Sequence, residues 1–209
     1  MCVYVNQSGG LSTTKCKLFD IICKKHTIEN ERILPHFIEL SVTYMLLICS
    51  ALSQFTFQKL MDVYRESNRL SGKENYPDLS GDRQLLESEQ DFYMFLREFF
   101  SVKGSKYYIL AASDCYRSAL RVEPFRDGLL IEGFETSPDS RHKGYGTELL
   151  QETLKTLQSV TVYSHIKKDN LYSLNTHLNC GFSVISDTAS YIDGSVDSKS
   201  YTLMKKCGP

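Results

Sequence analysis

The stretch Arg141-His142-Lys143-Gly144-Tyr145-Gly146 decides the fold predicted for this chain. It lies between a strand-like run, residues 129–136, and an amphipathic run, residues 145–157. Glycine lets backbone approach a ligand closely, and a helix that begins here directs its free N–H groups and the positive end of its dipole at the loop. Arg141 and Lys143 add positive charge. The arrangement therefore predicts a binding site for a diphosphate.

Two other phosphate-binding loops are excluded by specific residues. A Walker A loop needs Lys and then Ser or Thr directly after its last glycine, but Thr147-Glu148 follows Gly146. A dinucleotide-binding fingerprint needs a third small residue at the position that Leu149 occupies. The alternative that stays open is a glycine-containing turn from strand to helix that binds no ligand.

Hydrophobic periodicity and turn residues predict the remaining secondary structure. A loop is expected between the first two helices, where Ser71-Gly72, Tyr76-Pro77 and Ser80-Gly81 cluster. The predicted strands cover residues 45–52, 106–112, 115–123, 129–136, 160–165, 182–187 and 200–204, and the predicted helices cover residues 56–68, 82–100, 144–158 and 170–179. The elements therefore follow one another in the order β-α-α-β-β-β-α-β-α-β-β.

The loop has the form Arg/Gln-x-x-Gly-x-Gly/Ala, and with its flanks it resembles the GNAT superfamily of acetyl-CoA-dependent N-acetyltransferases in its stand-alone bacterial type. Residues 130–138 read much as in aminoglycoside-type members, and residues 170–182 read like the family's second coenzyme-binding segment. The resemblance covers residues 45–209. It implies an α/β (α+β mixed sheet) fold of the GNAT acyl-CoA N-acyltransferase type, with a mostly antiparallel central sheet, a splayed parallel strand pair and flanking helices.

The same resemblance implies that acetyl-CoA is the co-substrate and that the loop holds its pyrophosphate. Backbone groups at the end of the motif strand are expected to bind the oxyanion and the pantetheine arm, and Gly133 is expected to mark a bulge that opens the cleft. Asn170 is assigned to the coenzyme, although helix N-capping explains it equally well. The full predicted coenzyme set is Phe134, Glu135, Thr136, Arg141, His142, Lys143, Gly144, Tyr145, Gly146, Thr147, Asn170 and Ser173.

Glu132 is the candidate catalytic base, because transfer to an alkyl amine with a pKa near 10.4 benefits from a proton acceptor. It matches the glutamate of the Leu-Glu-Gly segment that similar aminoglycoside-type enzymes use, usually through water, with Ile131 in place of that leucine. Strand alternation predicts that Glu132 shares a face with Leu130 and Phe134 while Glu135 points the other way. The alternative is an ordinary solvated or ion-paired strand glutamate.

His177 is the candidate proton donor to the departing thiolate. It stands where many similar enzymes have a tyrosine, four residues before the glycine of the pair Gly181-Phe182. Histidine can donate a proton near neutral pH, and a helix histidine without a role is the alternative. Cys180 has no visible histidine–carboxylate partners in the sequence, so direct transfer is preferred to a covalent acyl-enzyme.

These residues predict an acetyl-CoA-dependent N-acetyltransferase that acts on a primary amine of a small molecule or peptide by direct sequential transfer. The alternatives are a catalytically degenerate module that binds coenzyme A and an enzyme that transfers a larger acyl group. Loops over residues 70–85 and 191–199 are expected to frame the acceptor, and their acidic residues favour a cationic amine.

Composition limits which other partners and which compartment are expected. A net charge of −1 and the lack of a basic block argue against nucleic acid, while seven unpatterned cysteines and no secretory signal favour a cytoplasmic protein. No metal is expected, because Cys23 and His26 lack a second ligand pair, and polar residues interrupt the uncharged run at 40–58 too often for a membrane span. A homodimer is left open.

Residues 1–44 are expected to be an N-terminal extension outside the GNAT domain, either flexible or foreign to the natural protein. One short helix is predicted within it, at residues 33–40.

Overall fold

The computed structural model describes residues 4–5, 11–12, 44–191 and 193–208. Its centre is a seven-stranded sheet in which only β6 and β7 are parallel neighbours and the other neighbouring strands are antiparallel. In spatial order the strands are β3 (Tyr44–Cys49), β4 (Lys106–Ala112), β5 (Cys115–Phe125), β6 (Gly128–Thr136), β7 (Thr161–Lys167), β11 (Ser200–Lys206) and β8 (Ser183–Ser186). The mixed, mostly antiparallel sheet predicted from the sequence is confirmed.

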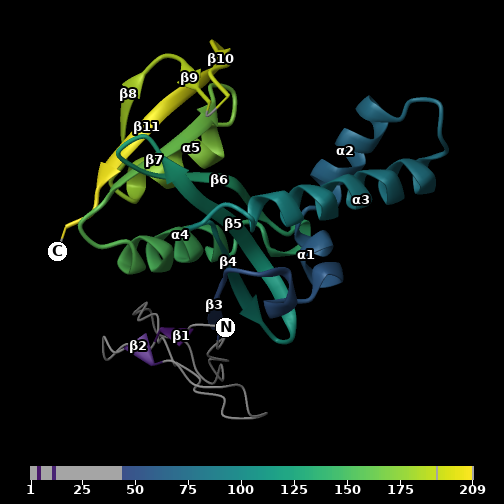
Figure 1. The fold of residues 1–209 in the computed structure, drawn as a ribbon, viewed down its shortest axis with the longest axis horizontal. Coiled ribbons are helices and arrows are strands. Elements are labelled where there is room, and N and C mark those ends of the chain that lie inside the picture. The colour runs from purple at the N-terminus through teal and green to yellow at the C-terminus, as the bar shows by residue number, and fades with distance from the viewer. Residues whose placement is uncertain (1–3, 6–10, 13–43, 192, 209) are drawn as a thin grey trace, which may run out of the picture.

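Helices cover both faces of the sheet (Figure 1). One face carries α1 (Phe57–Val63) and α3 (Gly81–Phe99), with α2 (Arg65–Asn75) packed against α3, and the other carries α4 (Tyr145–Thr156) and α5 (Leu171–Asn179). Figure 1 shows α2 and α3 projecting as a hairpin from the body of the molecule. The shorter elements are η1 (Leu52–Gln54), η2 (Pro138–Ser140) and the pairs β1 (Tyr4–Val5) with β2 (Leu11–Ser12) and β9 (Ala189–Ser190) with β10 (Val196–Asp197).

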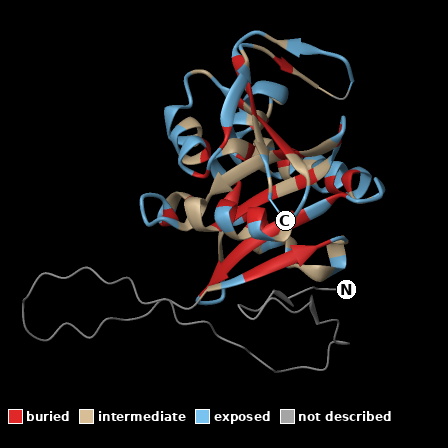
Figure 2. Cartoon of the chain, turned by 90° about the vertical axis from the view of Figure 1, so that its left-hand side faces the viewer, coloured by how far each residue is buried: buried red, intermediate tan, exposed pale blue. Residues whose placement is uncertain are grey.

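The sheet separates two apolar clusters because successive strand residues point to opposite faces. On β4, for example, Tyr107 and Ile109 pack with α1 and α3, whereas Tyr108 and Leu110 pack with α4. Figure 2 shows that the buried residues follow the strands. Each face of the sheet therefore has its own core, and the two cores fix the helices against the strands that carry the candidate site.

The region around α2 differs from the predicted loop. The helix predicted for residues 56–68 is interrupted at Tyr64, and α2 then continues to Asn75 through Gly72. A Cβ at Gly72 would lie 2.4 Å from the backbone oxygen of Gln84 in α3. Gly72 is thus a close-packing residue inside a helix pair, and not the turn that a glycine suggests in sequence.

The sheet begins at Tyr44, one residue before the predicted domain boundary. Tyr44 pairs with Ala112 of β4, and its hydroxyl donates a hydrogen bond to Glu148 of α4. The Cys23 and His26 pair and the helix predicted at residues 33–40 lie outside the described residues. No helix within the described parts of the chain is long and apolar enough to cross a membrane.

Candidate functional site

The parallel strands β6 and β7 separate in the middle of the sheet. They pair only through Leu129, Leu130 and Ile131 of β6, opposite Val162, Tyr163 and Ser164 of β7. Beyond Ile131 the β7 side of β6 has no strand partner among the described residues. This part of β6 therefore offers backbone groups without a strand partner to an extended ligand arm, apart from the Gly133 and Thr136 carbonyls, which accept hydrogen bonds from Tyr64 and Arg141.

A bulge at Gly133 accompanies this separation, as the sequence predicts. Arg121 of β5 pairs with Glu132 and Ala119 pairs with Glu135, so β6 contains one extra residue between them. Gly133 adopts a φ of +55°, which favours glycine. Its carbonyl accepts a 2.5 Å hydrogen bond from the hydroxyl of Tyr64, which the sequence analysis did not identify.

Glu132 shares a face with Leu130 as predicted, but the bulge changes which side chains share a face beyond it, so the predicted positions of Phe134 and Glu135 are wrong. Phe134 packs in the α4–α5 cluster, where its ring lies 5.6 Å from that of His177. Glu132 and Glu135 both face the α1–α3 side, because their partners Arg121 and Ala119 lie two residues apart on β5. Regular alternation fails because the extra residue shifts the side-chain order by one.

The two motif glycines have different roles. Gly144 adopts a φ of +81° directly before α4, and a Cβ there would meet no atom within 4 Å. At Gly146, by contrast, a Cβ would lie 2.9 Å from Thr136 Oγ1 and 3.4 Å from a ring carbon of Phe134. Gly144 thus leaves the space in front of the helix open, while Gly146 allows α4 to pack closely on β6.

The helix start is suited to an anion. Within the described part of the chain, no side chain caps the first N–H groups of α4, although Glu148 N–H bonds to the Gly144 carbonyl. Free N–H groups at a helix N-terminus, together with the helix dipole, favour negative charge. The open space at Gly144 and these uncapped donors therefore suit the binding of an anion.

The loop cations already have partners within the protein. Arg141 Nη1 lies 2.7 Å from Glu66 Oε2 of α2, and its Nε donates to the Thr136 carbonyl at 3.4 Å. Lys143 Nζ donates to the Asp139 carbonyl at 2.7 Å. These contacts order the loop around its backbone, and Arg141 also connects it to the α1–α3 side.

The start of α5 lies beside the loop. The ring of His142 is 5.9 Å from that of Tyr172, so the two segments predicted to bind the coenzyme are adjacent. Asn170 accepts a 3.1 Å hydrogen bond from the Ser173 N–H, which shows that it caps α5. Tyr145 packs on the sheet, with Arg117 6.0 Å from its ring, and Thr147 lies in the first turn of α4.

The environment of His177 favours a structural role over proton donation. The ring is buried against Phe134 and Phe182, and burial lowers its pKa to about 4. Nδ1 donates to the Ser173 carbonyl at 2.8 Å, and Nε2 lies 3.1 Å from Ser164 Oγ. Neutral His177 therefore accepts a hydrogen bond at Nε2 and connects α5 to β7. Its one ring proton is bonded to the Ser173 carbonyl and is not directed at the cleft.

Glu132 is held by a buried ion pair on the α1–α3 face. Its Oε2 accepts a 2.9 Å hydrogen bond from Arg121 Nη2, and both side chains are about four-fifths buried. The Arg121 guanidinium also stacks 4.8 Å from the ring centroid of Phe95 in α3. Glu132 is thus a fixed carboxylate with one oxygen, Oε1, directed away from Arg121.

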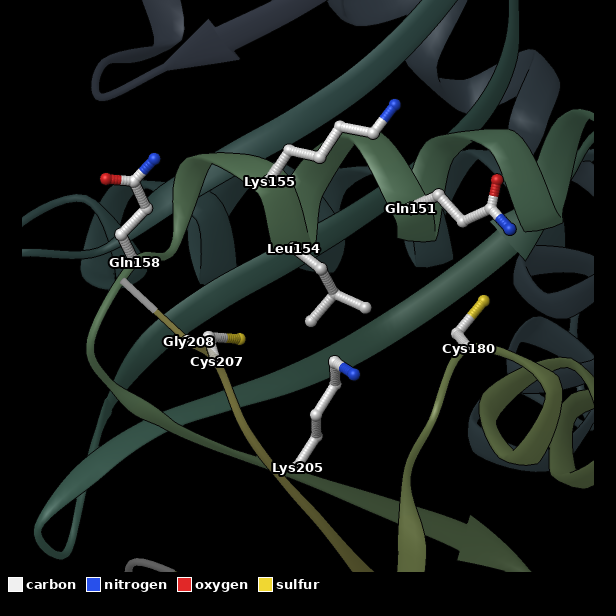
Figure 3. A pocket seen from close by; sticks show the side chains of 8 residues that line it. All are labelled: Gln151, Leu154, Lys155, Gln158, Cys180, Lys205, Cys207 and Gly208. Carbon is white, nitrogen blue, oxygen red and sulfur yellow. The ribbon is translucent and has the colours of Figure 1, made fainter.

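A shallow pocket of about 490 Å³ lies at the opposite end of α4 from the loop (Figure 3). Its lining includes Cys180 and Cys207 with Lys205 between them, but no histidine or carboxylate. Burial raises the pKa of the Cys180 thiol. This environment does not activate Cys180 as a nucleophile. Among the described residues, no cluster of three or more His, Cys, Asp or Glu side chains is arranged to hold a metal ion.

Two solved structures that resemble this chain in fold are N-acetyltransferases. PaiA N-acetyltransferase from Thermoplasma acidophilum, solved with coenzyme A, is 15% identical and covers 77% of this chain and 98% of its own, with a TM-score of 0.52. The ribosomal-protein-S18-alanine N-acetyltransferase from Escherichia coli is 15% identical and covers 79% and 96%, with a TM-score of 0.51. These likenesses show the fold, and the predicted GNAT architecture is confirmed.

A search of curated protein sequences found no match to this chain. The sequence profile of the Acetyltransferase (GNAT) family, in contrast, matches residues 60–182. This match begins within α1, ends just after α5 and includes the loop, Glu132 and His177. The chain therefore belongs to the GNAT acetyltransferase family.

Proposed function

We propose that this member of the GNAT acetyltransferase family transfers the acetyl group of acetyl-CoA directly to a primary amine of a small molecule or peptide. The observation that supports it best is the coincidence of two features at one point of the sheet. The uncapped start of α4 offers an anion site, and the unpaired edge of β6 beyond Ile131 leads from it into the gap beside β7.

Acetyl-CoA fits this arrangement by its chemistry. The pyrophosphate would bind the α4 N–H groups in front of Gly144, and the amide-containing pantetheine arm would bond to the free edge of β6. The thioester would then lie near the bulge at Gly133, where backbone groups can stabilise a tetrahedral oxyanion. PaiA from Thermoplasma acidophilum, which shares the fold, was solved with coenzyme A.

The α1–α3 face supplies the negative charge that would attract a cationic acceptor. Glu132 and Glu123 lie on this face, and burial together with the charge of Glu132 raises the pKa of Glu123. Two partly buried carboxylates favour a cationic amine, which must lose a proton before it attacks. Glu132 is the group we assign to receive that proton.

The test is a screen of primary amines, including polyamines, aminoglycosides and peptides with free N-termini, with acetyl-CoA and detection of the released thiol. The proposal predicts saturable thiol release that depends on one class of amine. It also predicts an acetamide product that is heavier than the starting amine by about 42 mass units, the mass that one acetyl group adds when it replaces a hydrogen. Thiol release at the rate of spontaneous hydrolysis with every amine would contradict it.

One observation favours a second function, a GNAT module that binds coenzyme A without catalysis. Glu132 already has an ion-pair partner in Arg121, which occupies one of its two carboxylate oxygens. Under this alternative, coenzyme A binds with normal affinity while no amine is acetylated, and replacement of Glu132 changes only stability.

A further inference from the structure

His165 lies on β7 directly after Ser164, the last residue that pairs with β6. Its side chain is only 3% exposed and points to the same face as Glu132. Phe125 and Tyr191 hold the ring from two sides, with centroid distances of 5.5 and 5.0 Å and nearly perpendicular planes. The imidazole is therefore fixed beside the gap between β6 and β7, on the side we assign to the acceptor.

Neither ring nitrogen of His165 has a hydrogen-bond partner among the described residues, although both are buried. The contrast with His177 is direct, because both nitrogens of that ring are bonded. Burying an unpaired polar atom costs stability, and buried polar groups in folded proteins are nearly always satisfied. Two such atoms on one rigidly held ring thus indicate a group that makes its hydrogen bonds to a ligand.

Glu132 is placed to act with this ring. Its Oε1 lies 3.9 Å from His165 Nδ1, while Arg121 holds Oε2. The separation is longer than a hydrogen bond, but catalytic hydrogen bonds are often long without substrate and shorten when it binds. A shift of about 1 Å would bring Nδ1–H to Oε1 in bonding distance. Arg121 would then prevent the carboxylate from turning away.

We propose that His165 relays the proton from the acceptor amine to Glu132. This inference rests on the proposed function. One proton of the acceptor ammonium group passes to the bare Nε2 of His165, and the Nδ1 proton passes in turn to Oε1 of Glu132, so that the imidazole stays neutral overall and the carboxylate becomes a carboxylic acid. The neutral amine nitrogen then forms a bond to the acetyl carbon while the carbon–sulfur bond of the thioester breaks. The departing coenzyme thiolate takes the second proton that the nitrogen loses, so charge is conserved.

The charges around His165 suit a neutral relay. Glu132 faces it from β6, Arg126 from the turn after β5, and the Tyr191 hydroxyl group belongs to the segment that follows β9. Burial lowers the pKa of His165, Glu132 raises it, and Arg126 lowers it further, with a net decrease. The ring is thus unprotonated at neutral pH and can accept a proton from an ammonium group.

The decisive variant is His165→Phe, which fills the space between Phe125 and Tyr191 and removes both unpaired nitrogens. We expect it to fold and to bind acetyl-CoA normally, with kcat lowered by about 10²-fold or more and a residual rate that rises with pH as more amine is neutral. Tyr163→Phe, two residues earlier on the same face, is the matched control and should keep kcat. Wild-type kcat and pH profile in His165→Phe would overturn the relay.

A second measurement needs no substrate. Nitrogen NMR of the imidazole in the full chain should show His165 with a protonated Nδ1 and a bare Nε2, and Glu132→Gln should lower its pKa. An unchanged His165 titration in Glu132→Gln would overturn the pair. A wild-type protein that acetylates no amine contradicts the proposed function instead, so the two failures are distinct.

Discussion

The two faces of the central sheet encode their parts of the site in different ways. On the α4–α5 face the anion site is local, since six consecutive residues and the helix that follows them build it. On the α1–α3 face the polar group is assembled from Arg121, Glu132 and His165 of three different strands. The first kind of site is readable from a motif, and the second becomes visible only when the strands are placed side by side.

The bulge at Gly133 connects the two faces. Its extra residue places Phe134 on the α4–α5 side and leaves Glu132 and Glu135 together on the other. It also lies just beyond the last β6–β7 pair, so the gap opens where the side-chain order shifts. Variants on each face and at the bulge test whether the two faces have the separate roles assigned to them.

The largest effect is expected from Glu132→Gln on the α1–α3 face. The amide keeps the size of the side chain and one acceptor oxygen, but it cannot take a proton, so kcat should fall by about 10²–10⁴-fold. The affinity for acetyl-CoA should change little, because the anion site proposed for the coenzyme lies on the other face. Steady-state kinetics over a range of pH checks this, and a variant with the wild-type rate and pH dependence would return Glu132 to a structural ion pair.

Acid should destabilise the α4–α5 face through His177. Burial lowers its pKa to about 4, whereas an unfolded chain has the ordinary value near 6.5. Between these values the unfolded state binds more protons, so the stability present above pH 6.5 is lost as the pH falls toward 4, by up to about 3 kcal/mol. Urea unfolding of wild type and His177→Gln at several pH values checks this. Equal pH slopes in the two proteins would contradict the assignment.

Tyr64→Phe tests the bulge itself. The Tyr64 hydroxyl donates to the Gly133 carbonyl at 2.5 Å and accepts from the Tyr107 hydroxyl at 2.7 Å, and both tyrosines are buried. Its removal takes the hydrogen-bond donor from the Gly133 carbonyl and the acceptor from the Tyr107 hydroxyl, which should cost about 1–3 kcal/mol of unfolding free energy. Chemical denaturation measures the loss. If stability remained within about 0.5 kcal/mol of wild type, this hydrogen bond would not be what fixes the bulge.

The smallest effect is expected at the N-terminus. Deletion of residues 1–43 keeps every strand of the central sheet, and we expect the unfolding free energy to change by less than about 0.5 kcal/mol. Tyr44→Phe is the comparison, since it removes the hydrogen bond to Glu148 and should cost about 0.5–1.5 kcal/mol. A truncated protein that aggregates would show that the preceding residues contribute to the core.

The contrast between the faces also explains what the sequence could predict. Apart from α2, which forms partly where a loop was predicted, the order of the main elements, the loop at Arg141–Gly146 and the bulge at Gly133 follow from local patterns of apolar residues and glycines. The roles of Gly72 and Gly146 did not, because only tertiary contacts show whether a glycine serves a turn or close packing. His165 carried no signal, since an isolated histidine in a strand has meaning only beside Glu132.

The most direct test of the division is calorimetric titration of acetyl-CoA into Gly144→Val. The valine side chain would fill the open space in front of α4, and we expect at least about a tenfold loss of affinity, or 1.4 kcal/mol. Gly194→Val is the matched control, because Gly194 has a φ of +83° against +81° for Gly144 and equally open surroundings. It should bind as wild type. Equal affinity in Gly144→Val and Gly194→Val would contradict the coenzyme site at this loop, and with it the account of the two faces.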